Sequence, residues 1–221
     1  MQSSAHYRSV LALTAQPVID WKAFAQCQSD AIVLSGQPML PAHEQDTRAA
    51  QTMVIECPSG SPLPTSQYLK RLSSLFSRIA IMVDFHSGPE LTRLDVKLSV
   101  LEARAGLADC SVDLFARIGA SAASVTKLND LRDKNPRLSA LVWQPGTPFE
   151  TEGIDSNARC ETARALVTLH AESFGVQALD WPHQQIDDFA LLCDRSKNDG
   201  FTGIVVHNSV DVAHANAIFS R

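Results

Sequence analysis

The sequence predicts one (β/α)8 barrel that spans residues 1–221 as a single domain. Eight short apolar runs, rich in valine and isoleucine, recur along the chain, and segments with helical spacing separate them. Such runs are typical of parallel strands buried on both faces. Because parallel strands need crossover connections, which helices usually supply, eight units close naturally into a barrel. An open doubly wound sheet is the alternative, but no GxGxxG or GxxxxGK motif follows the first strand to favour it.

The predicted strands are all short enough for the wall of a barrel. They cover residues 10–13, 31–34, 53–55, 79–83, 112–118, 138–143, 176–179 and 203–206. The run at 112–118 is the weakest of them.

Helical spacing of three and four residues occurs between these runs. One apolar stripe consists of Leu91, Leu94, Leu98, Leu101 and Ala105. Two shorter stripes consist of Val125, Leu128 and Leu131, and of Ala163, Leu166 and His170. Pro17 suits the start of the first helix, and Asp187 is expected to cap a helix over residues 189–193.

Composition limits the classes of partner. The net charge is −5 and the isoelectric point is about 5.8, which argues against a nucleic acid and against an anionic membrane. The cysteines are odd in number and form no CxxC motif, so we expect free thiols in a reducing compartment. The N-terminal residues lack the pattern of a signal peptide, and no apolar stretch is long enough to span a bilayer. We therefore expect a cytoplasmic protein.

The last third of the chain carries a set of motifs. The run NAR at 157–159 opens a predicted helix that leads into the run AESFGVQALD at 171–180. Asp187 and Asp188, the run DGFTGIVVH at 199–207 and the run NAIF at 216–219 follow. These motifs resemble the C-terminal half of the barrel in the citrate lyase β-subunit-like group, the HpcH/HpaI aldolase superfamily. The runs RSVL at 8–11 and SDAIVL at 29–34 are similar to the opening motifs of that group.

The resemblance implies a Mg²⁺-dependent carbon–carbon lyase that acts on acyl-thioesters or 2-oxo acids. In such a site a glutamate and an aspartate at neighbouring strand ends hold the cation, and an arginine holds the substrate. The resemblance also implies a small carboxylate or acyl-CoA-type ligand and a homo-oligomeric state.

The sequence departs from the group at the expected metal site. After the second strand, where the group has acids, this chain has the run SGQP at 35–38, and Glu56 lies after the third strand, where the group has an arginine. Arg117 lies near the expected metal-binding glutamate, and Thr147 takes the place of the aspartate. The usual metal ligands are therefore missing, and only the resemblance implies Mg²⁺ as a cofactor.

A second registration would preserve one ligand. It aligns the run LEARAG at 101–106 with an ETARG stretch of the group, which would keep Glu102. It also makes residues 91–101 partly a strand, and the helical stripe there argues against it.

Seven residues are candidates for the binding site: Arg8, Glu56, Asp84, His86, Arg117, Asp180 and His207. The resemblance gives Arg8 an anion-binding role, and a structural ion pair is the alternative. Asp84 and His86 suit acid–base chemistry. The alternative is that they belong to a solvated loop that caps a helix. Glu56 beside Asp84 would form an acid pair able to hold a metal at a shifted position.

The other candidates have roles of different kinds. Arg117 would replace the charge of a metal and hold a carboxylate or phosphate, or it is a surface arginine. Asp180 and His207 match the group's motifs and are expected to support the architecture rather than to catalyse. His183 is expected to line the mouth. Cys57 and Cys193 have no visible base partner and are not expected to be nucleophiles.

Three functions stay open, and the sequence alone does not decide whether the protein is an enzyme. The first is a diverged lyase with an altered or absent metal. The second is a non-catalytic barrel that binds a related ligand. The third is an interaction subunit that stabilises an active homologue.

Overall fold

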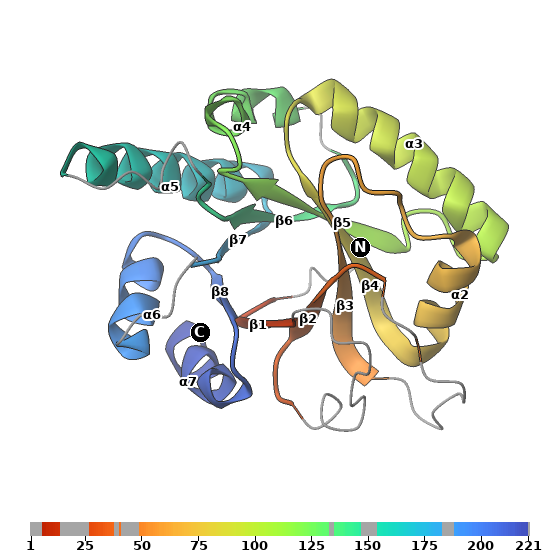
Figure 1. Ribbon diagram of the computed structural model, residues 1–221, viewed down its shortest axis with the longest axis horizontal. Coiled ribbons are helices and arrows are strands. Elements are labelled where there is room, and N and C mark those ends of the chain that lie inside the picture. Colours follow the sequence, from red (N-terminus) through yellow and green to blue (C-terminus); the bar gives the residue numbers. More distant parts are fainter. Residues whose placement is uncertain are drawn as a thin grey trace.

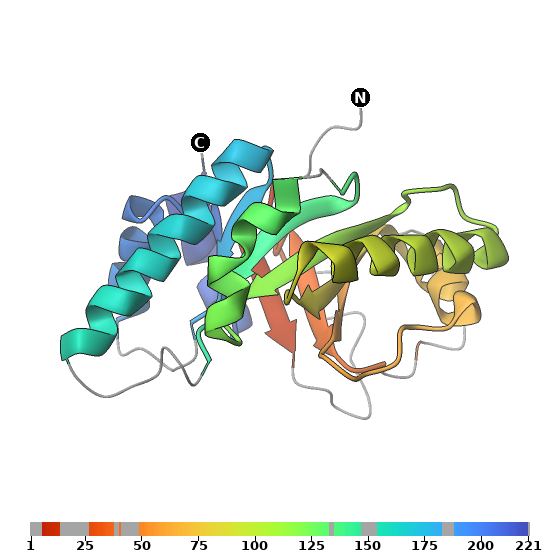
Figure 2. The ribbon, with the colours of Figure 1, turned by 90° about the horizontal axis from the view of Figure 1, so that it is seen from above.

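The computed structural model describes residues 6–13, 27–37, 40, 49–132, 135–146, 154–182 and 188–220. Eight parallel strands close into a barrel in the order of the sequence, and β8 pairs with β1 to complete it (Figure 1). Helices pack around this barrel, which confirms the predicted (β/α)8 fold (Figures 1 and 2). The red arrow of β1 in Figure 2 points toward the side from which Figure 1 is viewed. Figure 1 therefore looks onto the carboxyl ends of the strands.

From β3 onward, helices and strands alternate along the described part of the chain, as a barrel of this type requires. The strands are β1 (Ser9–Leu13), β2 (Ala31–Ser35), β3 (Ala49–Cys57), β4 (Phe76–Asp84), β5 (Val112–Ile118), β6 (Leu138–Trp143), β7 (Gln177–Asp180) and β8 (Gly203–Val206). The helices are α2 (Ser66–Leu75), α3 (Gly88–Ala105), α4 (Ala122–Thr126), the short 3-10 helix η1 (Leu128–Arg132), α5 (Ile154–Phe174), α6 (Phe189–Asn198) and α7 (Ser209–Phe219).

Three sequence-based expectations need correction. Residues 91–105 lie in the single helix α3, so the registration that made part of this segment a strand is wrong. The stripe at 125–131 is divided at Lys127 between α4 and η1. The cap of α6 is Asp188, whose Oδ1 accepts from the backbone N–H of Leu191 at 3.0 Å, because the capping residue directly precedes the first helical one. Asp187, Pro17 and His183 lie outside the described residues.

Side chains alternate along each strand between the inside of the barrel and its helical shell. One buried cluster joins apolar residues from all eight strands, and its members are two residues apart on most of them. Val10, Val33, Val54, Phe115 and Val205 are examples. The intervening positions pack against the surrounding helices in three further clusters. The inside of the barrel is therefore a packed core at mid-height.

The amino-terminal end of the barrel is closed by side chains. The ring of Tyr7 stacks edge-on against Phe115 with centroids 5.2 Å apart, and its hydroxyl meets Thr52 at 3.4 Å. Arg78 and Asp113, on neighbouring strands, form an ion pair at 2.9 Å. Among the described residues these side chains fill the amino-terminal end, so the carboxyl end is the one at which a ligand would approach the barrel.

Glu102 belongs to a buried structural network and not to the mouth. Its Oε1 accepts from Arg137 Nη1 at 2.6 Å and from the backbone N–H of Val112 at 2.7 Å, directly before β5 begins its run through the barrel wall. Arg137 directly precedes β6 and also pairs with Asp95. The network ties the end of α3 to the amino-terminal ends of two strands, so Glu102 cannot serve a site at the opposite end.

Gly203 is required by a close approach of backbone between β8 and the start of β1. A Cβ at this position would lie 1.9 Å from the carbonyl oxygen of Tyr7. We expect Gly203→Ala to lower the free energy of unfolding by about 2–3 kcal/mol, because the two strands must move apart. Urea denaturation of the variant measures this loss.

The matched control is Gly36→Ala. Gly36 has a φ of +87° and no atom within 4 Å of an added Cβ, so only the backbone conformation is penalised. This change is expected to cost about 1 kcal/mol. A loss at Gly203 no larger than the loss at Gly36 would contradict the steric explanation.

Candidate functional site

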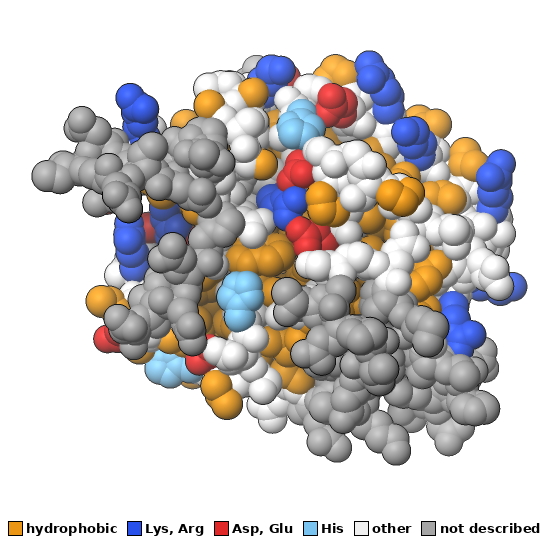
Figure 3. All heavy atoms as spheres, viewed as in Figure 1, with side chains coloured by type: hydrophobic (Ala, Val, Ile, Leu, Met, Phe, Trp, Pro, Cys, Tyr) orange, Lys and Arg blue, Asp and Glu red, His pale blue; other side chains and the backbone are white. Residues whose placement is uncertain are grey.

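The layer of inward side chains nearest the carboxyl end of the barrel is polar. It continues the alternation of the apolar core by one more step on seven strands. Its members are Ser35, Glu56, Asp84, Arg117, Gln144, Trp181 and His207. Figure 3 shows positive and negative side chains meeting near the centre of this face, beside a hydrophobic area. The active sites of this fold lie at the carboxyl ends of the barrel strands, where this polar layer is found.

Arg117 lies at the centre of this layer. Its Nε donates to Asp84 Oδ1 at 2.6 Å, and its Nη1 donates to Glu56 Oε1 and, at 3.1 Å, to Gln144 Oε1. The three charged side chains are only 9–12% exposed. The guanidinium therefore links the ends of β3, β4, β5 and β6. Two carboxylates and one guanidinium leave a formal charge of −1.

The remaining carboxylate oxygens of the cluster are also engaged. Ser35 donates its hydroxyl to Glu56 Oε2, and the backbone N–H of Ser59 donates to Asp84 Oδ2 at 2.9 Å. Burial alone would raise the pKa of Asp84, but the hydrogen bonds from Arg117 and Ser59 outweigh burial and hold the pKa below its usual value. The same acids hold the pKa of Arg117 above its usual value, against the effect of burial.

The lowered pKa of Asp84 makes the free energy of unfolding depend on pH in the acid range. A carboxyl group with a folded pKa below its unfolded pKa stabilises the fold fully at pH well above 3.8, and this contribution declines as the pH drops through the folded value. We expect Asp84→Asn to show a shallower loss of unfolding free energy between neutral and acid pH than the wild type. Urea denaturation across this range measures both slopes. Parallel slopes would mean that Asp84 has no depressed pKa.

The cluster does not fit a resident Mg²⁺ ion. Mg²⁺ requires free oxygen ligands in octahedral geometry, and the space between Glu56 and Asp84 is filled by the guanidinium of Arg117. Within the described ranges, no group of three or more His, Cys, Asp or Glu side chains is placed to hold a metal ion. In the described part of the mouth, Arg117 therefore takes the place that a cation would need between two acids.

The other side of the mouth is aromatic. Trp181 follows β7 and is 6% exposed, and His207 follows β8 and is exposed. Their rings lie 6.3 Å apart with a tilted orientation. A ligand over Arg117 would therefore have a charged wall on one side and an apolar wall with an imidazole on the other.

Two sequence-predicted residues lie elsewhere. Arg8 precedes β1 at the amino-terminal end, where its guanidinium forms a two-point ion pair with Asp30 at 2.8 and 3.0 Å. Asp180 is fully buried and points from β7 toward the helices, where it accepts from Arg164 at 3.0 Å and from Ser196 at 2.6 Å. Neither the guanidinium of Arg8 nor the carboxylate of Asp180 faces the mouth.

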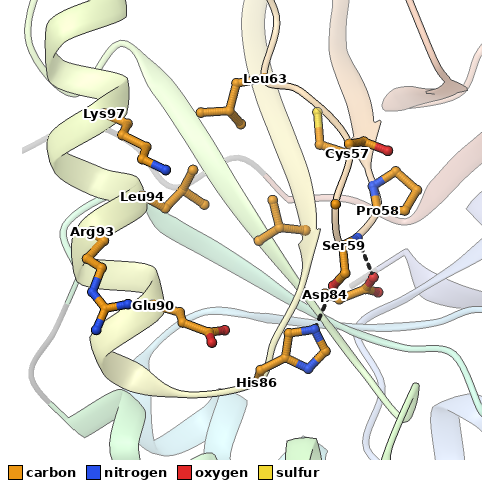
Figure 4. Close-up of a pocket in the computed structure, with 13 residues that line it drawn as sticks. Cys57, Pro58, Ser59, Leu63, Asp84, His86, Glu90, Arg93, Leu94 and Lys97 are labelled. Carbon is orange, nitrogen blue, oxygen red and sulfur yellow. Dashed lines mark hydrogen bonds between the residues drawn. The ribbon is translucent and has the colours of Figure 1, made fainter.

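His86 lies on the loop after β4, just outside the barrel. Its Nε2 shares a hydrogen bond of 2.6 Å with the hydroxyl of Ser59. Both residues line a cavity of about 300 Å³ between the ends of β3 and β4 and the helix α3 (Figure 4). Asp84 also lines this cavity, so it borders both the mouth and the outer pocket.

The cysteines are all free, as predicted. Burial, with a further contribution from Glu56, raises the pKa of Cys57 to about 11. Burial also raises the pKa of Cys193 to about 12. Thiols with such pKa values are protonated at neutral pH.

Sequence reasoning did not single out Gln144 or Trp181 and did not include Ser59. For the first two a signal was present, because each lies two residues beyond an apolar core position on its strand. Ser59 had no such signal, since its contact with His86 spans two loops.

A closed parallel barrel with charged side chains at its carboxyl rim defines the class as a (β/α)8 barrel with a charged mouth. No family model and no curated protein sequence matches the chain. Within the described residues no helix is both long and apolar enough to cross a membrane.

Solved structures share this fold. The citrate lyase β subunit of M. tuberculosis, complexed with oxaloacetate and magnesium, has a TM-score of 0.64 and 16% identity, over 99% of each chain. RipC from Yersinia pestis has a TM-score of 0.65 and 15% identity, over 99% of this chain and 97% of its own. Haloferax volcanii malate synthase, in its pyruvate and acetyl-CoA complex, has a TM-score of 0.73 and 16% identity, over 96% of this chain and 69% of its own. The predicted resemblance to the HpcH/HpaI aldolase superfamily is thus confirmed at the level of the fold.

Proposed function

We propose that this protein is a metal-independent barrel of the lyase or aldolase type. It binds a small carboxylate, either a 2-oxo acid or the acyl group of an acyl-thioester, in the mouth formed by Glu56, Asp84, Arg117 and His207. The observation that carries the proposal is the guanidinium of Arg117 between two acids, where a divalent cation would otherwise be needed. The compounds named with the similar structures, oxaloacetate, pyruvate and acetyl-CoA, support this choice of ligand class.

Arg117 has a free donor for such a ligand. Its Nε and Nη1 are used within the protein, and no acceptor for Nη2 lies among the described residues. A charge-assisted hydrogen bond from Nη2 would hold a carboxylate or carry part of the negative charge that develops on a carbonyl oxygen. The ion pairs with Glu56 and Asp84 would keep the guanidinium oriented for that purpose.

A second function, ligand binding without turnover, is favoured by one specific observation. Both oxygens of Glu56 and both oxygens of Asp84 accept hydrogen bonds within the protein. The pKa of Asp84 is also lowered. A general base works best with a pKa near the working pH, and the lowered pKa of Asp84 moves that carboxyl group away from it. Under this alternative His207, whose ring lies beside Trp181, would contact the ligand from the side of the mouth opposite Glu56 and Asp84.

Ligand binding in the absence of metal tests the proposal. We expect oxaloacetate, pyruvate or acetyl-CoA to raise the melting temperature by roughly 5–10 °C near saturation in EDTA, and Mg²⁺ to add nothing. Arg117→Lys keeps the positive charge but loses the planar set of N–H donors of the guanidinium. The affinity for the carboxylate ligand should therefore fall by about 10-fold or more. Turnover of the bound compound, followed by NMR, separates a lyase from a binding protein.

Each remaining outcome contradicts the proposal in a different way. Stabilisation that requires Mg²⁺ would mean that a metal site is formed by other residues. Stabilisation that Arg117→Lys leaves unchanged would place the ligand elsewhere. No stabilisation by any of the three compounds would favour the interaction-subunit function.

A further inference from the structure

The cavity beside α3 is a separate pocket outside the barrel. It lies between the loop that follows β3, the loop that follows β4 and one face of α3, and its volume is about 300 Å³. Figure 4 shows Ser59 and His86 at one edge of it and Lys97 on the opposite wall. A volume of this size is at the lower end for small-molecule sites, so the pocket suits a ligand of a few carbon atoms.

Ser59 and His86 form a hydroxyl–imidazole pair at the edge of the pocket. The 2.6 Å contact joins Ser59 Oγ to His86 Nε2, which is the arrangement in which an imidazole accepts a hydroxyl proton. The backbone of Ser59 is held independently, because its N–H donates to Asp84 Oδ2 at 2.9 Å. Ser59 is exposed and His86 is half-buried. The side chain of Ser59 is therefore accessible, while its backbone is held in place by Asp84.

The wall opposite this pair carries positive charge. Arg93 and Lys97 are one turn apart on α3, and no ion pair among the described residues involves either of them. Lys97 points into the cavity, and Glu90 points from the same helix toward His86 (Figure 4). Leu63 and Leu94 supply apolar surface between the two walls (Figure 4), and Val83 also lines the cavity. The pocket thus combines a nucleophile, a base, a short apolar floor and a cation.

We propose that this pocket is an acyl-transfer site in which Ser59 is the nucleophile and His86 the base. Its substrates are short-chain acyl esters or thioesters that carry an anionic group, which Lys97 binds. This activity is independent of the function proposed for the barrel mouth.

The reaction has two balanced steps. Ser59 Oγ attacks the acyl carbon, its proton passes to His86 Nε2, and the bond from the acyl carbon to the leaving oxygen or sulfur breaks as His86 returns that proton to the leaving group. Water then attacks the acyl-serine, gives one proton to His86 Nε2, and releases the carboxylic acid as Ser59 Oγ regains the proton. The sum is an ester or thioester plus water giving an acid plus an alcohol or thiol.

Two chromogenic esters of equal chain length test the proposal. The 4-nitrophenyl monoester of succinate is anionic, and 4-nitrophenyl butyrate is its neutral counterpart. We expect the full chain to release nitrophenol from both and Ser59→Ala to lower the rate by about 100-fold or more. His86→Gln should have an effect of similar size. Lys97→Met should slow hydrolysis of the succinate ester more than hydrolysis of the butyrate ester.

Ser61→Ala is the matched control, because Ser61 lies on the same loop and its side chain makes no hydrogen bond among the described residues, while its backbone N–H donates to the carbonyl oxygen of Pro58. It should retain the wild-type rate. A fluorophosphonate probe should add once to the wild type, on the peptide that contains Ser59, and not to Ser59→Ala. Hydrolysis that survives in Ser59→Ala, or a probe adduct on another residue, would overturn the proposal.

Discussion

Replacement of Arg117 by methionine is expected to lower the free energy of unfolding by about 3–5 kcal/mol in EDTA, because two largely buried carboxylates would lose their shared cation. The same variant should gain a response to Mg²⁺ that the wild type lacks. With the guanidinium gone, Glu56 and Asp84 face each other from neighbouring strands with free oxygens, the ligands that Mg²⁺ prefers. Urea denaturation with EDTA and with millimolar Mg²⁺ measures both effects.

The control for this prediction is the double variant Arg117→Met with Glu56→Gln. Removing one acid relieves the repulsion between like charges, so this variant should be more stable than Arg117→Met in EDTA. It should also lose most of the stabilisation by Mg²⁺, because one ligand is neutral. Equal stabilisation of the wild type and Arg117→Met by Mg²⁺ would show that Arg117 does not occupy the place of a cation.

Replacement of Arg137 by methionine is expected to cost about 3–5 kcal/mol, or roughly 6–20 °C in melting temperature for a domain of this size. Arg137 is 0% exposed and Glu102 is 1% exposed, so removal of the guanidinium leaves a carboxylate without its cation inside the protein. Glu102 would keep its bond from the Val112 N–H, which offsets only part of the loss. Thermal denaturation followed by circular dichroism measures the shift.

Arg195→Met provides a matched control at an exposed ion pair. Arg195 and Glu161 are 57% and 65% exposed and 3.9 Å apart, so this substitution should change stability by less than about 1 kcal/mol. If both variants lost the same stability, burial of the Arg137–Glu102 pair would not be the cause. Because Arg137 lies at the amino-terminal end, its variant should still bind ligands at the mouth at temperatures where it is folded.

The two arginines show how closure of the barrel gives similar side chains different roles. Arg117 ends its strand at the open rim, whereas Arg137 precedes its strand at the closed end. Both neutralise acids that come from other elements, but only Arg117 lies where a small molecule can reach it. A substitution at Arg137 is therefore expected to affect stability alone, and one at Arg117 both stability and ligand binding.

The sequence by itself determined the architecture. The apolar runs and helical stripes are local patterns, and the period of each pattern predicts its element, so the order of eight strands follows directly. Because sites of this fold lie at strand ends, the sequence predicts that Glu56, Asp84 and Arg117 lie at the rim of the barrel. The absence of the usual metal-binding acids was also visible, since it depends only on residue type.

Only the tertiary structure decided which of these residues meet. Arg117 is separated from Glu56 by 61 residues, and their contact depends on the register of β3, β4 and β5. The same holds for Ser59 and His86, which come from two loops, and for Asp180, which alternation turns toward Arg164 and away from the mouth. Local sequence sets the period of each element. The pairing register and the direction of each side chain arise from packing between distant segments, which no local pattern records.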